Sequence, residues 1–460
     1  MKFEEFILAH DGDDLASLAL ARGRYASDVQ DFDLALTTLE VRRKLRDKVP
    51  EWYAVPSLAY PFRLSGEQCS STVTALYKAH VAMAEGVPLE TQGHPRPCKR
   101  EGPVGEADGR GREATVSRGI PSAIADLTGG LGVDSWAFSK VFGRVLYNEM
   151  RPELAKAAEH NFQLLGATNI VVRNAALGPS CPAPGASSCP APTGHLPVRE
   201  ILGDFRPDIL YLDPARRAED GRKVFRLEDC QPDVLSLLPE LLEACPKLLL
   251  KLSPMADITL VCKQLGCVKQ VHVVAAGGEC KELLLLLEKG YEGVYRLFVV
   301  EDGAVQEIPG QAGNDGRVKV DGQAGNDAVV MAGCDRPSPC FLFEPGKALL
   351  KAGAFDWPCR FGLTKLGRHT HLYIGPEPVE ELTPFGKWFQ VLDVLPLNKR
   401  SLKEVASRYP QADVTARNIP LTSDELRARL KVRPGSGVHI FGLHEDASAE
   451  ALLYICARNG

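Results

Sequence analysis

The sequence lacks the cysteine and histidine patterns that mark metal sites and disulfide frameworks. It contains 13 cysteines, an odd number, and no two of them form a Cys-x-x-Cys pair. This argues against both a zinc site and a disulfide scaffold. His369 and His371 lie in an expected strand without an acidic or cysteine companion, so we interpret them as ordinary residues. We therefore expect no metal.

Long apolar runs and a strong net charge are also absent. No run approaches the roughly 20 residues of a membrane span, and Glu4 and Glu5 stand where a signal peptide needs a basic start. The formal charge is only −5, which gives no overall sign of a nucleic-acid partner, so any basic surface must be local. These absences favour a cytoplasmic protein that does not contact a membrane.

The composition is that of a globular protein, in a chain too long for one ordinary domain. The 460 residues are 45% hydrophobic and 25% charged, which excludes wholesale disorder and fits roughly two to four domains. Residues 1–85 carry apolar side chains at helical spacing and predict an N-terminal helical domain. Residues 86–119 are rich in glycine, proline and charge, as a flexible linker is.

Residues 120–290 alternate short apolar runs with helical segments. We predict strands at 123–127, 144–149, 170–173, 208–213, 247–252, 269–275 and 282–288. The alternation predicts an α/β fold with a doubly wound, Rossmann-like parallel sheet. Only residues 276–281 join the last two strands, too few for a parallel crossover, so the seventh strand should run antiparallel. This arrangement resembles the seven-stranded sheet of class I methyltransferases.

Two duplicated words interrupt the globular pattern: SCPAP at 180–184 and 188–192, and GQAGND at 310–315 and 322–327. Two copies cannot build a solenoid, so we interpret them as an insertion near 177–198 and a disordered insertion near 305–338. The remaining ranges, 291–375 and 376–460, predict small C-terminal α+β domains. In the second, Ser401–Tyr409 predicts a helix, Val438–Leu443 a strand, and Thr422 with Glu425 has capping-box spacing.

The strongest local signal is the glycine-rich turn DLTGGLGVD at 126–134, between a predicted strand and a predicted helix. Glycines here let the backbone pass close to a ligand and adopt dihedral angles that a Cβ would disfavour. The next strand ends in Glu149, about where nucleotide-binding sheets place the acid that binds ribose hydroxyls. A solvated glutamate at a strand end is the alternative.

The glycine spacing bears on the identity of the ligand. Gly-Gly-x-Gly does not match the dinucleotide fingerprint, and no Walker lysine follows, so neither NAD nor a nucleoside triphosphate is supported. S-adenosylmethionine (SAM) carries no phosphate, and its cationic groups would tolerate Asp126 and Asp134. After the third strand, Asn174 is a candidate for binding the adenine amine. The candidate cofactor residues are Asp126, Thr128, Gly129, Gly130, Gly132, Glu149 and Asn174.

The fourth predicted strand ends in Asp213 and breaks at Pro214. Ligands in open α/β sheets bind beyond the carboxyl ends of the strands, so Asp213 should share a crevice with the glycine turn. Proline removes a backbone donor and ends the ladder. Asp213, Pro214 and Arg216 are therefore the candidate catalytic residues, while surface ion pairing is the alternative role for Arg216 and Arg217.

The segment YLDPARR at 211–217 resembles both the Asp-Pro-Pro-Tyr motif of base-amine methyltransferases and the Asp-Pro-x-Arg motif of RNA 5-methyluridine methyltransferases. The second chemistry needs a nucleophilic cysteine just after the fifth strand, where this chain has Lys251-Leu252-Ser253-Pro254. Cys245 and Cys262 are poorly placed for that role. We therefore favour transfer to a nitrogen, with Asp213 orienting it.

Four segments together, DLTGGLGVDS, YNEMRPEL, YLDPARR and LLLKLSPMADI, resemble a bacterial family of class I SAM-dependent methyltransferases with a C-terminal THUMP-like domain. Three more segments extend the likeness to that family's N-terminal helices, ferredoxin-like domain and THUMP-like module: EQCSSTVTALYKA at 67–79, FEPGKALLKAGAF at 343–355 and VTARNIPLTSDELRARLKV at 414–432. The resemblance implies RNA methylation, because THUMP domains in other enzymes bind RNA. The chain departs from the family at 174–200, which weakens the case for Asn174.

A local charge bias points the same way. Residues 398–433 contain nine basic and four acidic residues, a balance of +5, which is typical of a phosphate-binding face. Lysine and arginine also solvate many helices. The leading hypothesis is a base N-methyltransferase acting on tRNA or rRNA. The alternatives are a catalytically silent RNA-binding protein on the same fold, and a methyltransferase of protein or small-molecule acceptors.

Overall fold

The computed structural model describes residues 2–25, 29, 31–84, 122–179, 195–216, 227–309, 340–435, 437–446, 448 and 450–458, with the backbone of 311–312 and 318–319. The predicted linker at 86–119 lies outside these residues, as does most of each range predicted as an insertion. The chain forms two compact units, Met1–Val271 with Glu282–Tyr295, and His272–Lys281 with Arg296–Gly460. Each unit is described by itself.

The first unit begins with helices, as the apolar spacing predicts. They are α1 (Phe3–His10), α2 (Leu15–Leu20), α3 (Arg22–Tyr25), α4 (Phe32–Lys48), α5 (Pro50–Tyr53), α6 (Arg63–Gln68) and α7 (Thr72–Ala84). Asp14 and Asp31 cap α2 and α4 by accepting hydrogen bonds from backbone N–H groups. The side chains buried between α1, α2 and α4 include Phe6, Leu18 and Leu39.

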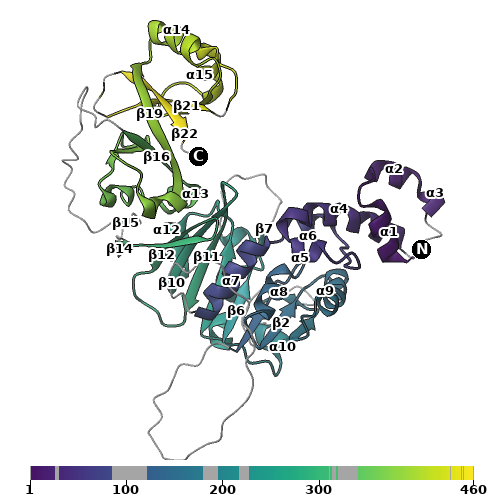
Figure 1. The fold of residues 1–460 in the computed structure, drawn as a ribbon. Helices are drawn as coiled ribbons and strands as arrows, with labels where there is room; N and C mark the ends of the chain where they lie inside the picture. The colour runs from purple at the N-terminus through teal and green to yellow at the C-terminus, as the bar shows by residue number, and fades with distance from the viewer. Residues whose placement is uncertain are drawn as a thin grey trace, which may run out of the picture. The chain divides into compact units, whose positions relative to one another are not determined.

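A sheet follows these helices (Figure 1), and its observed strands match the predicted ones closely. They are β1 (Ala123–Asp126), β2 (Arg144–Asn148), β3 (Ile170–Arg173), β6 (Ile209–Leu212), β9 (Lys247–Leu252), β10 (Val268–Ala276) and β11 (Glu279–Glu288). Their order is β10-β11-β9-β6-β1-β2-β3, and β12 (Arg296–Glu301) and β13 (Ala304–Ile308) follow beyond β10, so the sheet has nine strands among the described residues, where seven were predicted. Neighbours from β9 to β3 are parallel, and β11 runs antiparallel to β9. The predicted doubly wound fold is confirmed.

Short strands and helices complete this unit. The helices are α8 (Val133–Ser139), α9 (Pro152–Leu164), α10 (Val198–Leu202), α11 (Val234–Ala244), α12 (Ile258–Leu265) and the 3-10 turn η1 (Leu227–Asp229). The two-residue strands are β4 (Ala176–Leu177), β5 (His195–Leu196), β7 (Ala215–Arg216) and β8 (Cys230–Gln231). The sheet is buried on both faces, so β1 and β6 are apolar at nearly every position.

The N-terminal helices are bound directly to this sheet's helices. Helix α7 contacts α8, and it runs across the sheet in Figure 1. Asn161 of α9 exchanges two hydrogen bonds of 2.9 Å with the backbone of Ala59. Residues 2–84 and 122–271 therefore fold as one unit.

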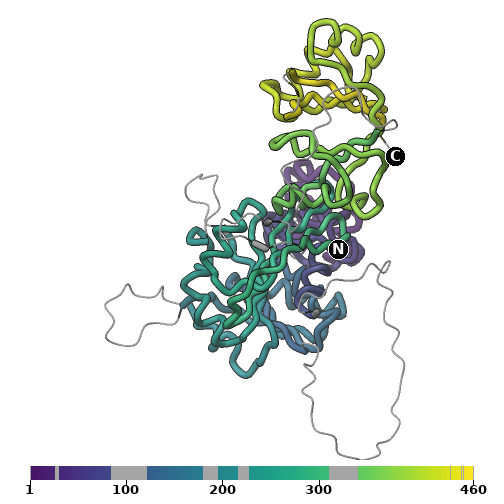
Figure 2. Tube along the Cα trace, turned by 90° about the vertical axis from the view of Figure 1, so that its left-hand side faces the viewer, coloured from purple at the N-terminus to yellow at the C-terminus, as the bar shows by residue number. Residues whose placement is uncertain are grey.

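The second unit, green to yellow in Figure 2, contains the outer strands β12 and β13 of the nine-stranded sheet and a seven-stranded mixed sheet. The strands β14 (Gln311–Ala312) and β15 (Val318–Lys319) form a two-stranded sheet. The seven-stranded sheet has the order β17-β18-β16-β19-β22-β21-β20. Its strands are β16 (Phe341–Pro345), β17 (Thr364–Lys365), β18 (Tyr373–Gly375), β19 (Gly386–Pro396), β20 (Asp413–Arg417), β21 (Val438–His444) and β22 (Ala451–Arg458).

The helices described in the second unit are α13 (Lys347–Ala352), α14 (Lys399–Arg408) and α15 (Ser423–Leu430), with 3-10 turns η2 (Pro358–Phe361) and η3 (Glu380–Phe385). Helices α14 and α15 pack on the seven-stranded sheet, whereas α13 contacts β12. Val405, Leu426 and Ile440 are fully buried in one core cluster. The predicted capping box of α15 is present, because Thr422 and Glu425 each bond the other's backbone N–H. Helix α14 confirms the helix predicted at Ser401–Tyr409, and β21 confirms the strand predicted at Val438–Leu443.

The expectation that His369 and His371 lie in a strand is wrong. His369 and His371 lie in the turn before β18, not in a strand. His371 has a φ of 51°, in the left-handed region, and its ring stacks on Phe355 with a centroid separation of 4.0 Å. Regular extended backbone has negative φ angles, so His371 interrupts the expected strand.

Candidate active site

The predicted site residues meet at one edge of the first unit's sheet. Asp126 ends β1, Glu149 follows β2, and Asp213 follows β6. Because these strands are parallel neighbours, their carboxyl ends lie together. Hydrogen bonds join the segments: the backbone N–H of Asp213 donates to Thr128 Oγ1 over 2.7 Å. Asn174 Nδ2 donates to the backbone carbonyl of Glu149, also over 2.7 Å.

The three glycines of the turn are needed for different reasons. Gly130 and Gly132 have φ angles of 53° and 94°, which side chains with a Cβ rarely adopt. A Cβ on Gly129 would lie 2.1 Å from the Tyr147 ring, so only a hydrogen fits there. A Cβ on Gly130 would meet no atom closer than 4.0 Å. The turn therefore leaves open space beside Gly130, where a ligand can approach the backbone.

Glu149 is held in place by backbone donors. Its side chain accepts hydrogen bonds of 2.9 Å from the N–H groups of Gly130 and Arg151, one on each oxygen. Only 8% of the residue is exposed. A carboxylate oxygen can accept more than one hydrogen bond, so both oxygens keep capacity for hydroxyl groups of a ligand.

Asp126 is completely buried, and burial raises the pKa of its carboxyl group to about 8. Ser135 Oγ and the Thr128 N–H both donate to it, over 2.6 Å and 3.1 Å. At neutral pH this carboxyl group is mostly protonated. Its visible contacts hold the glycine turn to the start of α8.

Asp134 stands in a different environment, although it is also buried. It accepts hydrogen bonds from Ser70 Oγ at 3.0 Å and from the Tyr211 hydroxyl at 2.8 Å. Burial alone would raise its pKa, but the Lys78 and Lys251 cations and these hydrogen bonds hold the pKa of Asp134 below its ordinary value. Asp134 is therefore an anion whose partners come from the protein itself.

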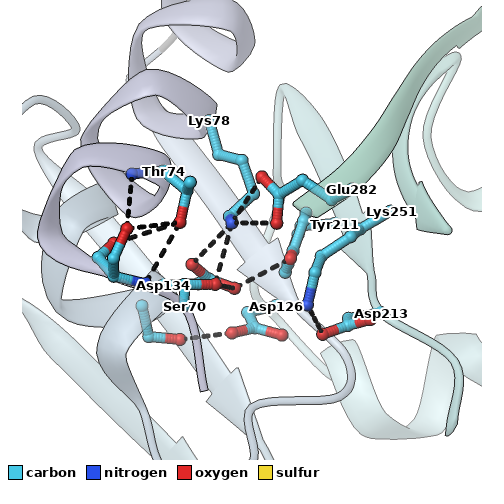
Figure 3. A network of polar contacts seen from close by, with 11 residues as sticks. Ser70, Thr74, Lys78, Asp126, Asp134, Tyr211, Asp213, Lys251 and Glu282 are labelled. Atoms are coloured by element: carbon cyan, nitrogen blue, oxygen red, sulfur yellow. Dashed lines mark hydrogen bonds and ion pairs between the residues drawn. The ribbon is translucent and has the colours of Figure 1, made fainter. Parts of the chain in front are cut away.

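Lys78 lies at the centre of this network (Figure 3). Its ammonium group is 2.9 Å from both carboxylate oxygens of Glu282, 2.8 Å from Ser70 Oγ, and 3.2 Å from Asp134 Oδ1. Lys78 is fully buried and Glu282 nearly so. Burial raises the pKa of Glu282, and the Lys78 and Lys251 cations oppose that rise.

Lys251 of β9 points to the same edge and forms an ion pair with Asp213, with 2.5 Å between Nζ and Oδ2. Burial would lower the pKa of Lys251, but the carboxylates of Asp213, Glu282 and Asp134 outweigh it and raise that pKa above its ordinary value. Lys251 is therefore a cation at neutral pH, directly beside the candidate catalytic aspartate.

Pro214 is buried, and Ala215–Arg216 form the short strand β7, paired with β8. The side chain of Arg216 and all of Arg217 lie outside the described residues. Their predicted contacts with an acceptor or with surface acids stay predictions.

Burial disfavours cysteine chemistry in this unit. Burial raises the pKa of Cys230, on β8, and of Cys262, on α12, to about 12 each. Burial also raises the pKa of the Cys245 thiol, and its Sγ lies 3.5 Å from the carbonyl oxygen of Pro207. These thiols are protonated at neutral pH, whereas a nucleophilic cysteine must ionise.

Sequence reasoning missed Ser70, Lys78, Tyr211 and Glu282 as parts of the site. One signal was available: the buried positions of α7 include Thr74, Ala75, Lys78 and Ala79, so the lysine falls on the apolar stripe. A charge on such a stripe needs a buried partner. Its partner Glu282 directly precedes the five consecutive leucines of β11.

No cluster of three or more histidine, cysteine, aspartate and glutamate side chains within the described residues could hold a metal ion. None of the helices within the same ranges combines the length and hydropathy of a membrane span.

Two family models match residues of the second unit. Residues 341–382 match the model of a ferredoxin-like domain, and residues 386–458 match that of a THUMP-like domain. The predicted C-terminal THUMP-like domain is thus confirmed. No curated protein matches the chain in sequence.

A solved structure resembles the whole chain. It is a proposed methyltransferase from Porphyromonas gingivalis W83, with 26% identity, a TM-score of 0.71, and coverage of 100% of this chain and 98% of the other. Further matches include an rRNA methylase from Streptococcus thermophilus, with 12% identity and a TM-score of 0.25, covering 36% of this chain and 86% of the other. A SAM-dependent methyltransferase from Aquifex aeolicus has 17% identity and a TM-score of 0.23, with 36% and 82% coverage. Likenesses as weak as these two do not bear on function.

Proposed function

We propose that this protein is a SAM-dependent methyltransferase that acts on a base nitrogen in tRNA or rRNA. The observation that carries the proposal is the meeting of a glycine turn, Glu149 and Asp213 at the carboxyl ends of β1, β2 and β6. It is supported by the whole-chain likeness to a proposed methyltransferase and by the THUMP-like domain.

The residues of the turn fit SAM. Glu149 offers two positioned oxygens to ribose hydroxyls, and the space beside Gly130 lets a ligand approach the backbone. Asn174 has an amide for the adenine ring, although its Nδ2 already donates to Glu149. When bound, SAM supplies an electrophilic methyl group. The protein's own part is to bind and orient, which can account for much of the rate of such a transfer.

Asp213 is the residue best placed to orient an acceptor. Its backbone is tied to Thr128 of the glycine turn, and its side chain is 34% exposed. A carboxylate there accepts a hydrogen bond from an amine and turns the nitrogen lone pair toward the methyl group. The protonated thiols of Cys230, Cys245 and Cys262 support nitrogen over ring carbon as the acceptor.

RNA is the proposed acceptor because of the C-terminal domain. Six basic residues on or next to the contacting helices α14 and α15 are exposed and form no ion pair with a described residue. They are Lys399, Arg400, Lys403, Arg429, Lys431 and Arg433. We call them the basic face. Unpaired exposed cations favour phosphate binding, since each can release a condensed counterion from the RNA.

Two other functions remain as alternatives. A catalytically silent RNA-binding protein would keep the basic face and bind no SAM. A methyltransferase of proteins or small molecules would bind SAM and use the C-terminal domains only as architecture.

The test is transfer of radiolabelled methyl groups from SAM into RNA purified from a strain that lacks the gene. We expect label in one RNA fraction with the intact protein and none with Asp213→Ala. Asp204→Ala, at an exposed aspartate of the same unit, is the matched control and should stay active.

Calorimetric SAM binding separates the alternatives. SAM binding without label in any RNA would support a protein or small-molecule acceptor. Absence of SAM binding, with RNA still bound at low salt, would support the silent RNA-binding protein.

A further inference from the structure

We propose that Lys251 is a positioning residue for methyl transfer, which holds one oxygen of Asp213 so that the other faces the acceptor nitrogen. The inference rests on the proposed function, in which Asp213 orients the acceptor nitrogen. It adds a residue that no sequence motif marked for this role.

In the Lys251–Asp213 pair, the aspartate is the more exposed partner. Lys251 and Asp213 lie on neighbouring parallel strands, where Leu250 pairs with Leu212. The lysine side chain is 14% exposed and the aspartate side chain 34%, so the aspartate forms the open end of the pair. Lys251 engages Oδ2, and Oδ1 accepts no hydrogen bond from the side chains that the structure describes. Oδ1 is therefore the oxygen available to an acceptor N–H group.

The ammonium of Lys251 is directed to Asp213 by competition among charges. Three carboxylates, those of Asp213, Glu282 and Asp134, attract it. Lys78 already occupies both oxygens of Glu282 and lies beside Asp134. Figure 3 shows Lys78 between these two acids, while Lys251 reaches Asp213. Helix α7 thus supplies the cation that leaves Lys251 available for the catalytic edge.

Other roles for Lys251 conflict with its charge. Its pKa is raised by the surrounding carboxylates, so it carries a proton at neutral pH and cannot accept one from the acceptor. During transfer the acceptor nitrogen forms its bond to the methyl carbon as the carbon–sulfur bond breaks and sulfur keeps the electron pair. The surplus proton leaves the nitrogen along its hydrogen bond to Asp213 Oδ1 and passes to solvent.

The test compares Lys251→Met, Lys251→Arg, Asp213→Asn and the double variant Lys251→Met/Asp213→Asn in the full chain. We expect Lys251→Met to lower kcat by about 10²-fold, as misplacement of a reacting group does, with the Kd for SAM changed less than about twofold. Lys251→Arg, which keeps the cation, should retain more activity. The double variant should be no slower than the slower single variant, because both changes remove one unit.

Chemical rescue separates positioning from a merely structural role. In Lys251→Ala, added methylammonium should restore part of kcat, because a small cation can enter the vacated space and bind Asp213. Lys251→Gln, which keeps a hydrogen-bond donor without charge, replaces Lys251→Met if that variant does not fold. A kcat within about twofold of the intact protein in the uncharged variants, or additive losses in the double variant, would overturn the inference.

Failure of the proposed function gives a different result. An intact protein that binds SAM and labels no RNA contradicts the RNA acceptor. The Lys251 comparison is then repeated on the acceptor that is labelled, and an unchanged kcat there overturns the role of Lys251.

Discussion

The ammonium group of Lys78 lies 2.9 Å from both carboxylate oxygens of Glu282, although 204 positions separate the two residues. Lys78 comes from helix α7 and Glu282 from strand β11. Both are buried, so water cannot screen the pair. A buried ion pair beside Asp134 therefore connects the N-terminal helices to the sheet.

The first prediction concerns this contact. Lys78→Met should lower the free energy of unfolding by about 3–5 kcal/mol, because it leaves a buried carboxylate without its cation. Equilibrium urea unfolding of the full chain measures the change.

The double variant Lys78→Met/Glu282→Leu is the control for this prediction. It removes both charges and should recover most of the lost stability, since an apolar pair can replace a buried ion pair. A double variant as unstable as the single one would show that Lys78 acts through Asp134 or Ser70 instead.

The second prediction is a pH dependence from Asp126. Its pKa is about 8 in the folded protein, against an ordinary value of 3.8. Between these values the unfolded carboxyl group is ionised while the folded one keeps its proton. Its stabilisation is therefore complete below about pH 4 and is lost as the pH rises toward 8, by up to about 1.4 kcal/mol per pH unit.

Asp126→Asn cannot ionise, so its free energy of unfolding relative to the intact protein should increase from pH 5 to pH 8. Urea unfolding at several pH values tests this. A constant difference for Asp126→Asn across this pH range would contradict the raised pKa of Asp126.

The third prediction concerns the glycine turn. A Cβ on Gly129 would lie 2.1 Å from the Tyr147 ring, so Gly129→Ala should lower the free energy of unfolding by about 1–3 kcal/mol, as overpacking does. It should also weaken SAM binding, measured by calorimetry. Gly12→Ala, where no atom lies within 4 Å of the added Cβ, should change neither quantity. Normal stability and SAM affinity in Gly129→Ala would mean that the ring moves aside.

The fourth prediction concerns the basic face. Lys399→Ala/Lys403→Ala/Arg429→Ala should weaken RNA binding uniformly across sequences. It should also reduce the slope of log affinity against log salt by about 0.7–0.9 for each phosphate that the variant no longer neutralises. Fluorescence anisotropy over a salt series measures both.

Arg408→Ala is the matched control for the basic face. Arg408 is on the same helix, but it is paired with Asp393 and Glu404 at 2.9 Å and 3.1 Å, so its removal should alter the slope little. Equal effects of the two variants would argue that RNA binds elsewhere.

Local sequence patterns predicted most strands of the first unit's sheet closely. The strands expected at 170–173 and 247–252 are β3 and β9 with the same bounds, because turn residues border short apolar runs on both sides. The connection expected at 276–281 is shorter: Gly277 and Gly278, with φ angles of 61° and 76°, alone join β10 to β11. Pairing with neighbouring strands makes β10 and β11 longer than the apolar runs from which they were predicted.

The strand expected at His369 and His371 was wrong for a physical reason. His369 and His371 were expected in a strand, yet His371 adopts a left-handed backbone and stacks on Phe355. The local preference for extended backbone takes no account of the stacking between His371 and Phe355, which are far apart in the local pattern. Tertiary packing overrode the local preference.

The sequence alone determined the strand and helix order, the glycine turn, and the positions of Glu149 and Asp213 at strand ends. These depend on periodicity and turn chemistry within some 10–20 residues. Only the tertiary structure decided that Asp126 is buried and protonated, that Lys78 is paired with Glu282, and that Lys251 holds Asp213. The charge state of a carboxylate depends on its burial and on cations brought from distant parts of the chain, and neither is a local property of the sequence.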